Sequence, residues 1–344
     1  MEGYNKKVIM SYWTICRMKT TKKIYVKVSI IFLLGGILLF SSCEKEENQK
    51  IEANRKTLFM YLPWSSNLTN YFYNNISDLE KCITKIGLNN EKVIVFISTG
   101  STEAMMFEIV SSHGRCKREI LKKYKSPPFT TIDGITAILN DVKAFAPASV
   151  YTMIIGCHGM GWLPVYEMKV RSAPHMKMHW EYQGVPLTRY FGGLTAEYQT
   201  DIKSLASGIA NAGMKMEYIL FDDCYMSSIE VAYELKDVTK YLIGSTSEMM
   251  AYGMPYAAIG EYLLGNPDYQ SGCEEFYNFY STYEIMPCGT LAVTDCSELE
   301  NMAAIIKSIN SKYSFDKSLR GTIQRLDGYT PVIFYDFADY KIGR

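Results

Sequence analysis

Two stretches of sequence decide the organisation of this chain: VYTMIIGCHGMGW at residues 150–162 and EYILFDDCYM at residues 217–226. Each contains a short apolar run typical of a strand that is buried on both faces of a parallel sheet. His158 follows the first run, and Cys224 follows the second. Because α/β proteins place ligands and chemistry at the carboxyl ends of their parallel strands, this arrangement predicts a catalytic site.

The residues around His158 and Cys224 suit such a position. Glycines on both sides of His158 let the backbone turn sharply and approach a ligand closely. After Cys224 the apolar residues adopt helical spacing from Met226 through Leu235. We therefore expect Cys224 to lie between a strand end and a helix start, where backbone N–H groups favour a thiolate and an oxyanion.

The order of these motifs resembles one known family. A strand that ends in His-Gly, followed at a distance by a strand that ends in Asp-x-Cys-x-Met and then by a helix, is similar to the clostripain family of cysteine peptidases. That family belongs with the caspases, gingipains and legumains, which share a His-Gly and Cys dyad. The resemblance extends over roughly residues 56 to 313, and it includes GSTSE at 244–248 and GTLAVTD at 289–295. It implies an α/β fold with a caspase-like, mainly parallel sheet between helices.

The remaining periodic segments agree with this fold class. Strands are expected over residues 57–62, 93–97, 104–110, 150–155, 217–221, 241–245 and 290–293. Helices are expected over residues 74–86, 130–145, 199–212, 226–235, 255–264, 271–285 and 297–309. Strands that alternate with helices of this length indicate a parallel sheet covered on both sides.

The chemistry that we expect is acyl transfer by a cysteine–histidine dyad. Cys224 is the candidate nucleophile and His158 the candidate general acid and base, since imidazole can both generate a thiolate and protonate a leaving amine. The resemblance implies that the backbone N–H groups of Gly159 and Cys224 hold the oxyanion. The other interpretation is a buried thiol and a core histidine. The sequence nominates no third catalytic residue.

An acid near the nucleophile bears on substrate choice. Asp222 stands two residues before Cys224, so both side chains can point to the same face of a strand. The resemblance implies that Asp222 binds an arginine or lysine side chain in the S1 pocket, with Glu248 as a second acid and Asp223 as the fallback. Bidentate pairing of a carboxylate with guanidinium would favour arginine. The other interpretation of Asp222 is a helix N-cap.

One stretch departs from the resemblance. Residues 249–252 are Met-Met-Ala-Tyr, whereas relatives carry a loop richer in glycine and proline. This departure bears on substrate specificity more than on catalysis.

The segment of residues 163–195 has no sustained period. A long loop inside a compact domain is usually functional. In the clostripain family the segment between the dyad residues is where self-cleavage occurs, so the resemblance implies self-cleavage here after one of four basic residues: Lys169, Arg171, Lys177 or Arg189.

No metal site is expected. His175 and His179 are four residues apart but have no third ligand nearby in the sequence. No cofactor is required by the chemistry above. Parts of the clostripain family depend on calcium, so a calcium requirement is implied by the resemblance alone, and the chain carries no calcium-loop pattern.

The amino-terminal residues 1–43 indicate a leader and lipoprotein signal peptide. The apolar stretch at 28–40 follows several lysines and has about 13 residues, which suits a signal peptide better than a membrane span. It ends in LFSSC, which resembles a bacterial lipobox with Cys43 as the lipidated residue. A plain secretory signal or a membrane anchor is the other interpretation. Met18 makes a more conventional start than Met1.

The expected domains follow from this leader. Residues 44–55 are charged and predict a flexible tether, and residues 56–344 predict one caspase-like peptidase domain. The sequence stops near Lys341, where a helix begins, and this suggests a truncated carboxyl terminus. The protein is expected to be exported and lipid-anchored to the bacterial cell envelope, at the outer membrane or cell surface.

The amino-acid composition limits the classes of binding partner that we expect. The 36 basic and 36 acidic residues give a net charge of zero, so no nucleic-acid partner is expected. The expected partners are peptides or proteins with a basic residue before the scissile bond, and the membrane through the lipid. Nine cysteines occur without a C-x-x-C motif. Five of them are expected to be small core residues: Cys82, Cys157, Cys273, Cys288 and Cys296.

Two rival functions stay open at this level. The first is a catalytically inactive caspase-like surface lipoprotein that binds a peptide or glycan. The second, more distant, is a metal-dependent hydrolase.

Overall fold

The computed structural model describes residues 54–163, 165, 191–314, 316–328 and 332–342. The predicted lipidation residue, the candidate self-cleavage residues and the histidine pair lie outside the described residues: Cys43, Lys169, Arg171, Lys177, Arg189, His175 and His179.

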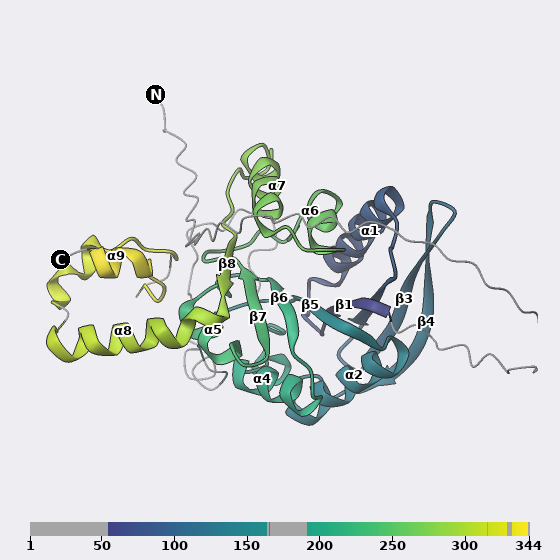
Figure 1. Ribbon diagram of the computed structural model, residues 1–344, viewed down its shortest axis with the longest axis horizontal. Coiled ribbons are helices and arrows are strands. Elements are labelled where there is room, and N and C mark those ends of the chain that lie inside the picture. The colour runs from purple at the N-terminus through teal and green to yellow at the C-terminus, as the bar shows by residue number, and fades with distance from the viewer. Residues whose placement is uncertain (1–53, 164, 166–190, 315, 329–331, 343–344) are drawn as a thin grey trace, which may run out of the picture. The chain divides into compact units, whose positions relative to one another are not determined.

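The described residues form one sheet of eight strands: β1 (Asn54–Leu62), β2 (Glu91–Ser98), β3 (Glu103–Ser112), β4 (Arg115–Lys125), β5 (Ala148–Gly156), β6 (Met216–Asp222), β7 (Thr239–Gly244) and β8 (Ala292–Asp295). The spatial order is β4-β3-β2-β1-β5-β6-β7-β8 (Figure 1). The five central strands, from β2 to β7 in this order, are parallel. The strands β3, β4 and β8 pair antiparallel at the two edges.

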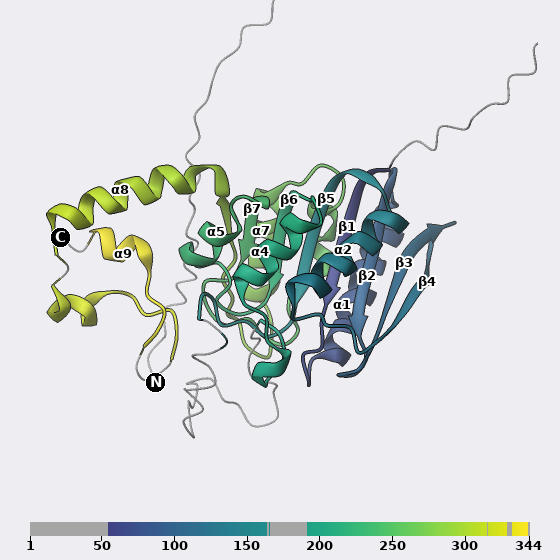
Figure 2. The ribbon, with the colours of Figure 1, turned by 90° about the horizontal axis from the view of Figure 1, so that it is seen from below.

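Helices cover both faces of the sheet. One layer comprises α1 (Thr69–Ile86), α6 (Tyr256–Leu263) and α7 (Tyr269–Ser281). The other comprises α2 (Ile132–Phe145), α4 (Ile202–Asn211) and α5 (Ile229–Leu235), which lie side by side in Figure 2. The prediction of a mainly parallel sheet between two helical layers is confirmed.

The core follows from the alternation of side chains along the buried strands. On β1, Leu58 and Met60 join the cluster under α1, whereas Phe59 and Tyr61 join the cluster under α2. The same division applies to the other central strands. The apolar runs that predicted strands from the sequence therefore supply both cores at once, which fixes the strands in register.

The strand β4 was not predicted, because charged residues occur throughout its sequence. It lies at the edge of the sheet and pairs with β3 through a tight turn at His113 and Gly114, where both φ angles are positive. Lysines on an exposed edge strand discourage pairing with another chain. His113 is exposed in this turn.

Other boundaries differ from the predictions by a few residues. The strand β1 begins at Asn54, within the predicted tether, because its first residues already pair with β5. The helix α1 begins at Thr69 rather than at residue 74, and it ends before Gly87 as predicted. No disulfide joins the described cysteines. Burial is confirmed for Cys82, Cys157 and Cys296, whereas Cys273 is half-buried and Cys288 is exposed.

The chain after β8 continues through η2 (Cys296–Glu298), α8 (Leu299–Lys312), η3 (Lys317–Thr322) and α9 (Phe337–Ile342). A further short 3-10 turn, η1 (Ala196–Tyr198), precedes α4. Between η3 and α9, Phe334 is buried and stacks on Tyr225, with ring centroids 4.5 Å apart. The carboxyl-terminal segment thereby contacts the residue that follows Cys224. Among the described helices, none is both long and apolar enough to cross a bilayer.

Candidate active site

The register of β5 and β6 brings the two candidate catalytic residues to the same edge of the sheet. The last pair of this parallel ladder is Gly156 with Asp222. His158 lies two residues beyond Gly156, and Cys224 lies two residues beyond Asp222. Because adjacent strands are about 4.8 Å apart, the chain segments that carry the thiol and the imidazole leave the sheet side by side.

Gly159 shows how closely these two segments approach. A Cβ atom at Gly159 would lie 2.4 Å from the carbonyl oxygen of Cys224, a distance that a side chain cannot tolerate. Glycine is therefore required here so that the backbone after His158 can rest against the backbone of Cys224. Among the described residues, no backbone carbonyl accepts a hydrogen bond from the N–H group of Gly159.

His158 is held in place by both its backbone and its ring. The side chain is 1% exposed, and the backbone N–H donates to the carbonyl oxygen of Gly192 at 3.1 Å. The ring Nε2 lies 2.8 Å from Oδ1 of Asn67. With an amide oxygen as its partner, Nε2 carries the proton and Nδ1 carries the lone pair of the neutral ring.

Asn67 is a site residue that sequence reasoning missed. It lies in the loop between β1 and α1, and β1 is the neighbour of β5 on the side opposite β6. The available signal was a polar residue just beyond the carboxyl end of a predicted strand. An exposed asparagine in a loop has many ordinary roles, so only the contact with His158 distinguishes it.

Cys224 is fully buried, with 0% exposure. The backbone N–H of Met249 donates to its sulfur at 3.1 Å, and the sulfur lies 3.5 Å from the carbonyl oxygen of the same residue. A donor directed at the sulfur stabilises the thiolate more than the thiol.

Cys224 lies between the end of β6 and the start of α5, as predicted, but the helix does not begin directly after it. The helix α5 begins only at Ile229, where the hydroxyl of Ser228 caps it through the N–H of Val231. Between Cys224 and the helix, Tyr225 has a φ of 58°, a left-handed conformation that interrupts helical geometry. The N–H that reaches the sulfur therefore comes from Met249, outside the helix. Such a strained backbone next to a reactive side chain is typical of functional sites.

The residues 245–255 form a loop after β7 that covers Cys224, and we call it the covering loop. Its first part runs beside the segment after β6, because the N–H of Tyr225 donates to Ser247 and the N–H of Ser227 donates to Ser245. Met249 then contacts the thiol as described above. The three segments that leave β5, β6 and β7 thus meet around Cys224.

Asp222, the expected S1 anchor, fastens the far end of the covering loop. Its carboxylate accepts hydrogen bonds from the N–H of Met254 at 2.8 Å and from the hydroxyl of Tyr256 at 3.1 Å. The side chain is 1% exposed. A basic side chain can therefore reach Asp222 only after the covering loop moves.

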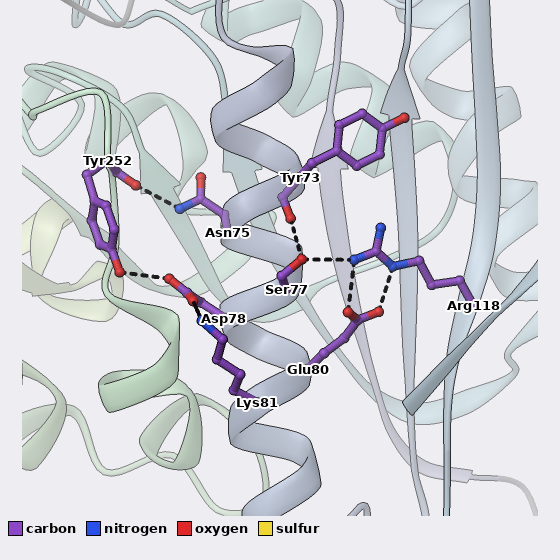
Figure 3. A network of polar contacts seen from close by, with 8 residues as sticks. All are labelled: Tyr73, Asn75, Ser77, Asp78, Glu80, Lys81, Arg118 and Tyr252. Carbon is purple, nitrogen blue, oxygen red and sulfur yellow. Dashed lines mark hydrogen bonds and ion pairs between the residues drawn. The ribbon is translucent and has the colours of Figure 1, made fainter. Parts of the chain in front are cut away.

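The helix α1 holds the middle of the covering loop (Figure 3). The hydroxyl of Tyr252 donates to Asp78 at 2.7 Å, and the amide of Asn75 donates to the carbonyl oxygen of Tyr252 at 2.7 Å. Asp78 also pairs with Lys81 at 2.8 Å. The stretch at residues 249–252, which departs from the resemblance, is therefore held against α1 by hydrogen bonds of Tyr252.

The opposite side of α1 is tied to the edge of the sheet. In Figure 3 the guanidinium of Arg118 on β4 binds both carboxylate oxygens of Glu80, at 2.6 and 2.8 Å. This bidentate pair fixes α1, and α1 in turn positions the covering loop.

Glu248 lies in the covering loop and is half-buried. Burial raises the pKa of its carboxyl to about 7, the nearby hydroxyl of Tyr225 opposes the rise, and the charge of Asp327 adds to it. Its Oε1 atom has no hydrogen-bond partner among the described residues. Glu248 therefore lies near Tyr225, the residue after Cys224, and its Oε1 atom can still accept a hydrogen bond. Its charge changes near neutral pH.

Asp223, the fallback acid, contacts the segment that leaves β5. It is fully buried and accepts a hydrogen bond from the backbone N–H of Cys157 at 2.7 Å. Its carboxylate is thus directed at the segment that leaves β5.

A cavity of about 520 Å³ is lined in part by the segment that follows His158. Its lining includes Met160 and Trp162 from that segment, the start of α4, and the acids Glu230 and Glu234 of α5. In the part of the chain that the structure describes, no group of three or more His, Cys, Asp or Glu side chains is arranged to hold a metal ion.

Comparisons with known proteins place these features in context. A sequence profile of the clostripain family matches residues 60–342. Among solved structures, the chain is similar to a secreted C11 cysteine protease from Bacteroides thetaiotaomicron called iotapain, with 60% identity and a TM-score of 0.77 over 84% of this chain and 80% of that chain. A search of curated proteins found no match.

A more distant neighbour shows the fold alone. It is an inactive zymogen C11 protease from Parabacteroides distasonis, with 24% identity and a TM-score of 0.69 over 84% of this chain and 77% of that chain. Together these likenesses confirm the family resemblance and the caspase-like fold that the sequence predicted.

The contact between Asn67 and His158 can be tested by substitution. We expect Asn67→Ala to lower kcat for a peptide substrate by about 10- to 100-fold with little change in KM, because a misdirected imidazole transfers protons poorly. Asn67→Asp, which keeps the acceptor, should retain more activity than the alanine variant. Asn74→Ala, an exposed asparagine on α1, is the matched control. An unchanged kcat in Asn67→Ala would contradict the orienting role.

Proposed function

This chain belongs to the clostripain family of cysteine peptidases, and we propose that it is an endopeptidase that cleaves after basic residues through a dyad of Cys224 and His158. The observation that carries the proposal is the last pair of the β5–β6 ladder, Gly156 with Asp222, because both dyad residues lie two positions beyond it. The peptide-cleaving class is that of the family, and the named roles are our assignment.

The proposed reaction uses the groups described above. The sulfur of Cys224 attacks the carbonyl carbon of the scissile bond, and His158 accepts the thiol proton and returns it to the leaving amine. A thioester forms and is then hydrolysed by water. The backbone N–H groups of Gly159 and Cys224 are the proposed donors to the oxyanion.

The proposed S1 pocket contains Asp222 and Glu248. When a substrate binds, the arginine or lysine side chain replaces the N–H of Met254 as a partner of Asp222, which requires the covering loop to open. Glu248 supplies the second negative charge at the side of the pocket nearest Tyr225. A guanidinium would satisfy the carboxylate in bidentate geometry, so arginine is the preferred residue.

The closed state of the site supports an activation step. Both Cys224 and Asp222 are buried, so peptide access requires a change at the covering loop. We propose that self-cleavage within residues 163–195 promotes this change, at one of Lys169, Arg171, Lys177 or Arg189. Export is proposed from the leader sequence and from the similarity to a secreted protease, and lipid anchoring through Cys43 from the lipobox.

Cleavage of matched fluorogenic peptides that end in Arg, Lys, Asp or Ala tests this function. We expect turnover of the Arg and Lys peptides by the wild type, and a loss of more than about 10³-fold in Cys224→Ala and in His158→Ala. Cys116→Ala, which changes a cysteine on the edge strand β4, is the matched control and should retain full activity.

Two outcomes would contradict the proposal. Cleavage that survives in Cys224→Ala would remove the dyad assignment. No cleavage of any peptide by the wild type, even after limited proteolysis within residues 163–195, would favour the non-catalytic binding lipoprotein.

The pKa of Glu248 generates a separate prediction about specificity. Since its carboxyl has a raised pKa of about 7, Glu248 is mostly neutral below pH 7 and charged above it. The ratio of kcat/KM for an arginine peptide to that for its neutral isostere citrulline should rise by about tenfold as pH increases through 7, as expected for a charge-assisted hydrogen bond of about 1.5 kcal/mol.

Titration of the dyad changes kcat/KM for both substrates by the same factor, so it does not affect this ratio. In Glu248→Gln the ratio should stay flat across this pH range. A pH-dependent ratio that persists in the glutamine variant would show that another group reads the substrate charge.

A further inference from the structure

Two residues lie between the end of the β5–β6 ladder and the dyad, one directly after β5 and one directly after β6. Cys157 directly precedes His158, and Asp223 directly precedes Cys224. Both side chains are 0% exposed. Neither has a role in the chemistry proposed above.

Cys157 donates two hydrogen bonds to Asp223, one from its backbone N–H group and one from its thiol. Oδ1 of Asp223 accepts from the backbone N–H of Cys157 at 2.7 Å, and Oδ2 accepts from the thiol of Cys157 at 3.3 Å. Hydrogen bonds to a carboxylate are stronger than those between neutral groups. The pair therefore joins the two segments one residue before each dyad member.

The contact continues the ladder beyond the point where backbone pairing ends. The last backbone pair is Gly156 with Asp222, and the next connection across the two strands is made by the side chain of Asp223. Asp223 also packs against the His158 segment, since a Cβ atom at Gly159 would lie 2.8 Å from its Cβ. Without this connection, only contacts between loops would fix the distance between the segments that follow β5 and β6.

A buried carboxylate is costly unless it is paired, so its presence in this position calls for a function. We infer that Asp223 is a positioning residue of the peptidase, which acts through Cys157 to set the distance and orientation of His158 relative to Cys224. The inference rests on the proposed dyad. It treats the Asp223–Cys157 contact as part of the catalytic geometry, whereas a purely structural contact would affect only the amount of folded protein.

The test compares kcat per active site, with active sites counted by titration with an irreversible peptide inhibitor. We expect Asp223→Ala to lose about 100-fold in kcat with KM changed less than about twofold, because small errors in the placement of reacting groups have effects of that size. Asp223→Asn keeps an oxygen for the N–H of Cys157 and should recover most of the loss. Asp237→Ala removes an exposed aspartate, 85% exposed, and is the matched control.

Variants of Cys157 separate its two contacts. Cys157→Ser keeps both donors and should resemble the wild type, and Cys157→Ala keeps the stronger backbone contact and should lose less than Asp223→Ala. If Asp223→Ala does not fold, Asp223→Leu fills the same space without accepting a hydrogen bond and allows the same comparison with Asp223→Asn.

The outcomes distinguish this inference from the proposed function. A wild type that turns over peptide, together with an Asp223→Ala variant of equal kcat per active site, overturns the positioning role alone. A loss in Asp223→Asn as large as in Asp223→Ala also overturns it, because the acceptor would then not matter. A wild type that cleaves no peptide overturns the proposed dyad and the inference with it.

Discussion

The hydrogen-bonded register between β5 and β6 is the constraint on which the site depends. Ile155 pairs with Phe221 and Gly156 pairs with Asp222, so the segments that follow leave the sheet in step. A slip of one residue would turn every side chain to the opposite face, so that the residues that fill one core would enter the other. The apolar runs buried on both faces therefore place His158 and Cys224 at matched positions on neighbouring strands.

The same site is held closed by several independent contacts. Asp222 holds one end of the covering loop, α1 holds Tyr252 in its middle, and Met249 lies against the thiol. Phe334 stacks on Tyr225 from the carboxyl-terminal segment. The carboxylate of Asp222, which we propose to bind the substrate, thus already has hydrogen-bond partners within the protein. We propose that the buried thiol of Cys224 becomes accessible to substrate when the covering loop opens.

Sequence reasoning succeeded where one segment determines its own structure, and it failed where a distant segment decides. The buried runs predicted the central strands and the placement of Cys224 and His158 at strand ends. The left-handed backbone conformation of Tyr225 makes α5 begin later than predicted, and a tyrosine at that position does not indicate such a conformation. The role of Asn67 and the hydrogen-bond partners of Asp222 depend on contacts between loops after different strands. The strand β4 was hidden by its charges, which suit an exposed edge.

The most direct measurement is to label the protein with an irreversible peptide inhibitor that carries arginine next to its reactive group, and to locate the adduct by peptide mass mapping. The account predicts a single adduct on Cys224 in the wild type and a much slower labelling of Cys224 in His158→Ala, because one residue activates the other. An adduct on a different cysteine, or equal labelling rates in the two proteins, would contradict it.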